Sequence, residues 1–174
     1  TEIITNNKKV TGVKINNENV IECDYIICNS DPPNVYKNLL KNDNNYSFLF
    51  KQKMKRMNYS MGLFVYYFGS KKQYKDVAHH TIWLTERFKE LLTDIFERKV
   101  LSSDFSQYLH IPTITDPDMA PEGHHAAYTL IPVPHNGSKI DWDVKGPLLV
   151  NKVLQFLDDR NYIPNLMERI VVQS

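Results

Sequence analysis

Histidine is the residue type in this chain that most directly offers metal or proton-transfer chemistry. The 174 residues contain six histidines, four of them in two adjacent pairs, His79-His80 and His124-His125. Neighbouring residues on a strand point to opposite faces, so each pair would offer at most one ligand to either side. Neither H-x-x-x-H nor H-E-x-x-H spacing occurs. The sequence therefore predicts exposed or hydrogen-bonded histidines and no metal site.

The serines and glycines offer no support for two other kinds of site. No serine stands in the G-x-S-x-G setting of a hydrolase nucleophile. The six glycines are too scattered to form a G-x-G-x-x-G or Walker phosphate loop. Hydrolysis therefore has no positive support, and this chain does not supply the primary anchor of a nucleotide.

One polar turn stands where an α/β sheet would hold a ligand. Asn29-Ser30-Asp31 follows the apolar run Tyr25–Cys28, which is typical of a strand buried on both faces of a parallel sheet. Ligands lie at the carboxyl ends of such strands, so Asn29, Ser30 and Asp31 are candidates for contact with a cofactor held mainly by another segment. The simpler interpretation, which turn statistics favour, is that Asp31 caps a helix beginning at Pro32.

The most apolar strand predicted is Ser60–Gly69. Phe64, Tyr66 and Phe68 alternate with a second uncharged set, Met61, Leu63, Val65 and Tyr67. Such a strand needs cover on both faces. Helices can cover one face, and the face with three aromatic rings is either protein core or the wall of an apolar ligand cavity. Periodicity leaves both interpretations open.

The sequence predicts that the secondary-structure elements carrying the candidate residues fall into two parts of the chain. Before a polar break at Lys41–Tyr46, asparagine-rich turns separate three strands of a predicted meander, Glu2–Thr5, Val10–Ile15 and Val20–Glu22. After the break, strands alternate with helices. The expected strands are Ala78–Leu84, Phe105–Ile111, Ala126–Val133 and Ile170–Ser174. Thr85 is expected to cap a helix whose inner face carries Phe88, Leu91, Leu92, Ile95 and Phe96, with Asp94 paired with Arg98 on its outside. A second helix is expected to start at Pro147.

The overall charge and the cysteine content indicate which kinds of binding partner and compartment suit the protein. Lys and Arg number 21 against 20 Asp and Glu, so no global field steers the protein to nucleic acid. The two cysteines, Cys23 and Cys28, are too close in an extended segment to bridge, which suggests a reducing compartment. A basic and apolar stretch, Phe48–Met57, could meet an anionic membrane, although an ordinary strand with a solvated face explains it without a partner. Strand-like sequence at both ends leads us to expect a piece of a longer protein.

Ordered blocks in the second part resemble the bacterial phytoene desaturase family. They are Ser60–Gly69, Ala78–Ile82, Arg87–Leu101, Asp104–His110, Thr115–Pro117 with Ala120-Pro121, and Ile131–Pro134 with Ile140–Trp142. Tyr25–Asp31 with its following helix resembles a strand and helix of the same family. The matches cover most of the chain in order, so chance agreement is improbable.

The resemblance implies an FAD-dependent flavoprotein of the amine-oxidase-like superfamily that desaturates phytoene towards lycopene or an earlier product. Residues 1–45 would be a middle piece of a doubly wound FAD-binding domain, and residues 46–174 part of a substrate domain of mainly antiparallel sheet with helices. Residues Phe64, Tyr66, Phe68 and Tyr108 become the expected contacts of the long apolar substrate. The expected location is cytoplasmic, peripheral at the inner face of the cell membrane.

The departures from the family pattern limit this expectation. The given sequence lacks the family's N-terminal G-x-G-x-x-G segment and its glycine-rich C-terminal segment at the flavin. This piece alone is therefore expected to bind FAD poorly or not at all and to be inactive. No catalytic residue is assigned. Two alternatives stay open: a carotenoid or retinoid isomerase or saturase of the same superfamily, and a non-catalytic carrier of apolar ligands.

Overall fold

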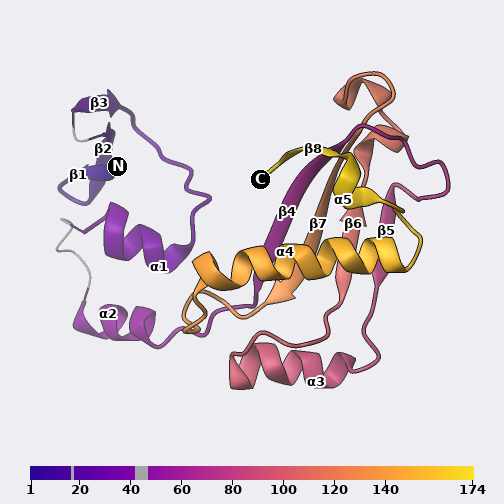
Figure 1. Cartoon of the computed structure of the whole chain (residues 1–174). Coiled ribbons are helices and arrows are strands. Elements are labelled where there is room, and N and C mark those ends of the chain that lie inside the picture. Colours follow the sequence, from indigo (N-terminus) through magenta and orange to yellow (C-terminus); the bar gives the residue numbers. More distant parts are fainter. Residues whose placement is uncertain (17, 42–46) are drawn as a thin grey trace. The chain divides into compact units, whose positions relative to one another are not determined.

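The computed structural model describes residues 1–16, 18–41 and 47–174. It separates into two compact units, Thr1–Asn58 and Tyr59–Ser174, and each is described by itself. The described residues form a mixed α/β structure with two antiparallel sheets, one in each unit (Figure 1). The mixed class expected from the sequence is confirmed in this form. Most of the expected boundary at Lys41–Tyr46 lies outside the described residues.

The first unit begins with the predicted three-stranded meander. Strands β1 (Glu2–Asn6), β2 (Lys9–Ile15) and β3 (Asn19–Glu22) pair as antiparallel neighbours. Asn7 and Asn16 adopt positive φ angles of 47° and 51°, the left-handed conformation that asparagine tolerates in tight turns. The asparagine-rich turns predicted from the sequence are therefore the turns that join the strands of both hairpins.

The strand predicted at Tyr25–Cys28 is not formed. This segment has no regular secondary structure, and Tyr25 and Ile27 are 91% and 99% exposed. The prediction was wrong because an apolar run becomes a strand only when a neighbouring strand pairs with its backbone. The helix that follows does form, as a short α1 (Pro32–Asn34) continued by a π-helical turn over Val35–Leu39.

Helix α2 (Phe48–Lys55) replaces the strand predicted for the basic stretch. The Ser47 hydroxyl accepts a hydrogen bond from the Phe50 backbone N–H at 3.2 Å and so caps the helix. The lysines at every second position resemble strand alternation, but the residues from Leu49 to Lys55 are mainly good helix formers. The serine cap and these propensities outweigh the period-two pattern.

The second unit contains a five-stranded antiparallel sheet in the order β5-β6-β7-β4-β8. The longest ladder joins the two nine-residue strands β4 and β7 over nine residue pairs, from Gly62↔Val133 to Ser70↔His125. All five strands lie where the sequence places them, within a few residues. Their bounds are β4 (Gly62–Ser70), β5 (His80–Trp83), β6 (Gln107–His110), β7 (His125–Val133) and β8 (Ile170–Gln173).

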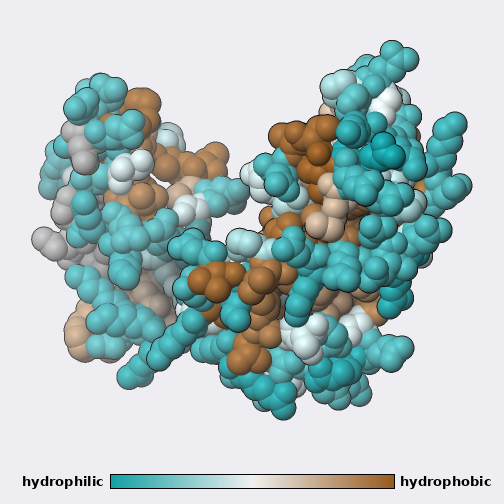
Figure 2. Space-filling view, in the orientation of Figure 1, coloured by the Kyte–Doolittle hydropathy of each residue, from teal (hydrophilic) through white to brown (hydrophobic). Residues whose placement is uncertain are grey.

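Helix α4 (Trp142–Asp159) covers one face of this sheet (Figure 1). The Asp141 carboxylate accepts hydrogen bonds from the backbone N–H groups of Asp143 and Val144, so the helix begins at Trp142. The predicted start at Pro147 was wrong, because Pro147 is the sixth residue of the helix. Figure 2, drawn from the helix side, shows polar surface along much of α4 and apolar side chains where β8 lies.

Helix α3 (Phe88–Thr93) and the π-helical turn Asp94–Arg98 form the other predicted helix. Leu91 and Ile95 are buried and the Asp94–Arg98 ion pair forms at 2.7 Å, as expected, but the predicted place of Asp94 on the outside of the helix was wrong, because Asp94 is buried. The predicted Thr85 cap was also wrong, because the helix begins at Phe88 with Arg87 as its N-cap. Phe88 and Phe96 are 44% and 48% exposed, so the buried stripe is narrower than predicted. The remaining helical elements are short: 3₁₀ turns at Pro112–Ile114 and Pro117–Met119, and α5 (Leu166–Arg169).

Candidate functional site

The aromatic face of β4 lies under helix α4. Tyr66 and Phe68 are 4% and 5% exposed, and the Phe64 ring stacks on Trp142 with centroids 5.7 Å apart. Helix residues Leu154 and Leu157 belong to the same hydrophobic cluster. In this chain the face is packed core, and a contact between Phe64, Tyr66 or Phe68 and substrate stays a prediction.

The other face of the sheet carries apolar side chains that remain partly or largely exposed. We call it the open face. Strand register places two rows of side chains across four strands, because directly paired residues share a face. One row is Val65, Leu130, Tyr108 and Ile82, and the other is Tyr67, Tyr128, His110 and His80. Leu63, next to the first row on β4, completes the open face. Leu63, Tyr67 and Ile82 are more than half exposed.

Aromatic rings contact one another along this surface. The Tyr128 ring lies 5.4 Å from Tyr67, 5.9 Å from Tyr108 and 4.8 Å from His110, measured between centroids. Burial against these neighbours raises the pKa of the Tyr108 phenol, which stays protonated. Tyr108 is the one sequence-predicted substrate contact that the fold places on the open face. The alternation Ala126, Tyr128, Leu130 in β7 was the signal that could have revealed the rest of it.

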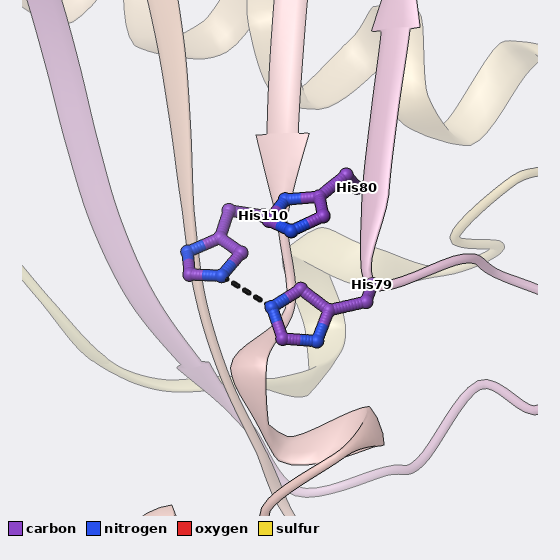
Figure 3. A group of neighbouring side chains, drawn as sticks. All are labelled: His79, His80 and His110. Carbon is purple, nitrogen blue, oxygen red and sulfur yellow. Dashed lines mark hydrogen bonds between the residues drawn. The ribbon is translucent and has the colours of Figure 1, made fainter.

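Three histidines meet at one end of the open face. His79 immediately precedes β5, His80 begins it, and His110 ends the neighbouring β6. Figure 3 shows the three rings turned towards one another, with a hydrogen bond between the Nε2 atoms of His79 and His110 at 2.6 Å. The prediction that the adjacent histidines point to opposite faces was wrong, because His79 lies outside the regular strand and its ring centroid is 4.2 Å from that of His80.

The outer nitrogens of two of these rings are fixed by hydroxyl groups. Thr115 Oγ1 lies 2.8 Å from Nδ1 of His79, and the Tyr108 hydroxyl lies 2.8 Å from Nδ1 of His80. Nδ1 of His110 is buried without a hydrogen-bond partner. Burial lowers the pKa of His110, and the neighbouring His79 and His80 lower it further. This favours the neutral imidazole of His110 near neutral pH.

Two grooves border the sheet on the side of α4. One, of about 690 Å³, has Phe64, Tyr66 and Leu154 in its wall. The second, of about 790 Å³, contains the ion pair between Arg87 and Asp104 at 2.9 Å. A hydrogen bond from Thr85 is the main cause that lowers the pKa of the Asp104 carboxyl. The second groove has charged walls and the first is more apolar, so only the first suits a hydrocarbon.

The turn residues Asn29, Ser30 and Asp31 form no cradle for a phosphate group. All three are exposed, and the Asp31 side chain makes no capping hydrogen bond. The Ser30 hydroxyl accepts instead from Asn34 at 3.0 Å, and the Asp31 carbonyl accepts from the Val35 N–H at 3.0 Å. A free carboxylate repels a pyrophosphate. The described residues of this unit therefore do not by themselves fit a dinucleotide, and a contact of the turn with a cofactor stays a prediction.

Sequence comparison finds several phytoene desaturases among the curated proteins that are similar to this chain. The chain is 41% identical over 168 residues to the lycopene-forming phytoene desaturase of Paracoccus sp. (strain N81106 / MBIC 01143), covering 94% of the chain and 32% of that protein. It is 36% identical over 173 residues to the neurosporene-forming enzyme of Rhodobacter capsulatus, covering 97% of the chain and 33% of that protein. The zeta-carotene-forming enzyme of Myxococcus xanthus is 33% identical, covering 98% of the chain and 32% of that protein.

The match extends over nearly all of this chain but over only part of each relative. The chain spans about a third of the length of the curated relatives it matches. No family model matches it. Identity of 33–41% over more than nine-tenths of the chain agrees with the ordered blocks recognised in the sequence. The chain belongs to the phytoene desaturase family.

Proposed function

We propose that this chain is a segment of an FAD-dependent carotenoid desaturase and that its open face forms part of the wall against which phytoene binds. The observation that carries the proposal is the two rows of apolar and aromatic side chains on the face of the sheet opposite α4. The relatives' names supply the substrate.

A surface of this kind suits a long hydrocarbon. Phytoene has no polar groups, so its binding depends on the apolar area removed from water, at about 25 cal/mol per Å². Aliphatic side chains such as Val65 and Leu130 supply that area, and the ring faces of Tyr67 and Tyr128 stack well against double bonds. A helix or loop from another part of the enzyme packed on the same face is the competing explanation.

The remaining details of the enzyme belong to the same proposal. Residues 1–45 would lie in the doubly wound FAD-binding domain and residues 46–174 in the substrate domain. Because the described turn at Asn29–Asp31 does not build a phosphate cradle, FAD would be held mainly by segments in the remaining two thirds of the enzyme's length. The similar relatives form lycopene, neurosporene or zeta-carotene, so identity to them does not select the product.

Helix α2 is the part of the chain that suits a membrane surface. Phe48 and Leu49 are 73% and 78% exposed, and Lys51, Lys53 and Lys55 are exposed on the same short helix. Exposed apolar side chains beside cations favour insertion into an anionic lipid surface. We propose peripheral association with the inner face of the cell membrane through α2. No helix among the described residues has the length and apolar character needed to cross a bilayer.

The substrate proposal is tested in the full-length enzyme with phytoene in liposomes. Tyr67→Ser and Leu130→Asn should raise the KM for phytoene at least tenfold while the thermal unfolding temperature changes little. Leu157→Ala, on the buried side of α4, is the matched control and should lower the thermal unfolding temperature more than the open-face variants do. If the open-face variants lower stability as much as Leu157→Ala and leave KM unchanged, the face is core covered by another segment and the proposal is wrong.

Product analysis separates the alternative functions. A desaturase lengthens the conjugated system of its product and shifts the absorption to longer wavelength, whereas an isomerase leaves the number of conjugated double bonds unchanged and a saturase reduces it. A non-catalytic carrier would bind a carotenoid without flavin and release it unaltered. Expression of the full-length protein in a host that accumulates phytoene therefore decides between them.

The membrane proposal has its own test. Full-length enzyme should sediment with vesicles of phosphatidylglycerol and phosphatidylcholine, and Phe48→Ser with Leu49→Ser should reduce the bound fraction several-fold. Lys71 and Lys72 lie on a loop of the second unit, so Lys71→Ala with Lys72→Ala serves as a control that lowers charge elsewhere. Unchanged binding of Phe48→Ser with Leu49→Ser, together with a loss in Lys71→Ala with Lys72→Ala, would assign the binding to charge outside α2 and contradict a role of α2.

A further inference from the structure

We propose that His79, His80 and His110 form a binding site for a divalent transition metal, with Zn²⁺ as the best-suited ion. One nitrogen of each imidazole lies within 4.8 Å of the others. Figure 3 shows the three imidazole rings gathered together, with Nε2 of His79 facing Nε2 of His110. Three imidazoles with one open position form a common zinc ligand set. This site is independent of the desaturase chemistry proposed above.

The tautomers implied by the hydrogen bonds leave a lone pair on His79 for a metal. The Thr115 hydroxyl donates its single proton to the Pro112 carbonyl at 3.3 Å. With the hydroxyl proton assigned in this way, its oxygen accepts from Nδ1–H of His79 at 2.8 Å, which puts the proton of His79 on Nδ1 and the lone pair on Nε2. A metal-ligating histidine usually donates its other ring N–H to an oxygen acceptor, and the Thr115 hydroxyl is such an acceptor for His79.

His110 then donates its Nε2 proton to His79 when no metal is bound. This leaves the lone pair of its buried Nδ1 without a partner. Metal binding moves the proton of His110 from Nε2 to Nδ1, so the ring stays neutral and both Nε2 atoms become ligands. No proton is gained or lost by His110 in this exchange. The third ligand, His80, is held through its own Nδ1 by the Tyr108 hydroxyl at 2.8 Å.

The distances require only a small adjustment. Zinc binds imidazole nitrogen at about 2.0–2.1 Å, so two nitrogens of a tetrahedral site lie about 3.4 Å apart. The Nε2 atoms of His79 and His110, now 2.6 Å apart, would separate by a fraction of an ångström, and the widest pair would close from 4.8 Å by a little over 1 Å. Rotation of the exposed His80 ring supplies such a shift. The bound ion would fasten the start of the edge strand β5 to the end of β6.

Metal titration of the full chain tests the site without flavin or substrate. After treatment with a chelator, the 174-residue chain and the full-length enzyme should each bind one Zn²⁺ by calorimetry. Co²⁺ should give the visible absorption of a tetrahedral site, which Zn²⁺ then removes. His80→Gln and His110→Gln should each weaken Zn²⁺ binding at least tenfold. His124→Gln changes a histidine outside the cluster and should leave the affinity unchanged.

Two results would overturn the metal site. One is Zn²⁺ affinity that is the same in wild type, His80→Gln and His110→Gln. The other is the lack of a Co²⁺ spectrum in a wild-type chain that circular dichroism shows to be folded. His80 is exposed, so its variant tests the ligand set even if His110→Gln unfolds the sheet. Because the titration contains no phytoene, its outcome does not depend on the proposed desaturase function.

Discussion

Tyr67 on β4 and Tyr128 on β7 lie directly opposite each other, with ring centroids 5.4 Å apart, on the face of the sheet that α4 does not cover. On the covered face of the same strand, Tyr66 is paired with Thr129 and is only 4% exposed. Adjacent residues of one strand therefore have different environments. This difference predicts that substitutions on the covered face cost more stability than substitutions on the open face.

In the isolated chain, Leu157→Ala should cost about 2–5 kcal/mol of unfolding free energy, because it leaves a cavity at a fully buried position. Tyr67→Ser should cost about 0.2–1 kcal/mol, the size of one cross-strand pair. Urea unfolding followed by circular dichroism measures both. A loss for Tyr67→Ser as large as that for Leu157→Ala would show that the open face is packed in the isolated chain.

The chain should lose stability in mild acid because of His125. This side chain is 5% exposed, and its Nε2 accepts from the Tyr74 N–H at 2.9 Å. Burial lowers the pKa of His125 below its usual value of about 6.5. The unfolded chain therefore binds a proton first as the pH falls, and stability is lost from about pH 6.5 downwards, by at most about 1.4 kcal/mol per pH unit for this group.

Urea titrations between pH 7.5 and 5 measure this loss. His125→Asn should lower stability at pH 7.5 and reduce its dependence on pH. The control His135→Asn removes a histidine that is only partly buried. Retention of the full pH dependence in His125→Asn would mean that another group causes it, with His110 the next candidate because its pKa is also lowered.

Two arginine–aspartate ion pairs differ in burial and should therefore differ in their contribution to the free energy of unfolding. Asp94 is buried and bonded by Arg98 at 2.7 Å, whereas the Arg87–Asp104 pair is more exposed. Arg98→Ala should cost about 1–3 kcal/mol, since it leaves a buried carboxylate without that partner. Arg87→Ala should cost less than about 1 kcal/mol. Chemical denaturation at low salt compares them, and equal losses would contradict the burial argument.

The N-terminal cap of α4 gives a further prediction. Asp141→Ala removes the acceptor for the N–H groups of Asp143 and Val144 and should cost about 1 kcal/mol of unfolding free energy. Asp141→Asn keeps an oxygen acceptor and should lose only a few tenths of a kcal/mol. Thermal unfolding distinguishes the two variants. Indistinguishable variants would mean that the helix does not depend on this cap.

Much of the secondary structure could be predicted from local sequence. Asparagine clusters predicted the hairpin turns of the meander, and apolar alternation predicted β4 and β7 to within two residues. These succeed because turn conformation and strand periodicity depend on neighbouring residues. Tyr25–Cys28 and Phe48–Met57 failed for complementary reasons. A strand needs a partner that a short run cannot reveal, and a serine cap with helix-forming residues outweighed an alternating pattern.

The sequence by itself determined the family, because ordered blocks along the chain match phytoene desaturases, and it determined that β4 has two uncharged faces. Only the tertiary structure decided which face is covered, because that depends on where α4 packs some eighty residues later in the chain. It also brought His110 to His79 and His80 through the pairing of β5 with β6. Strand register, which no local pattern specifies, therefore placed both the open face and the histidine cluster.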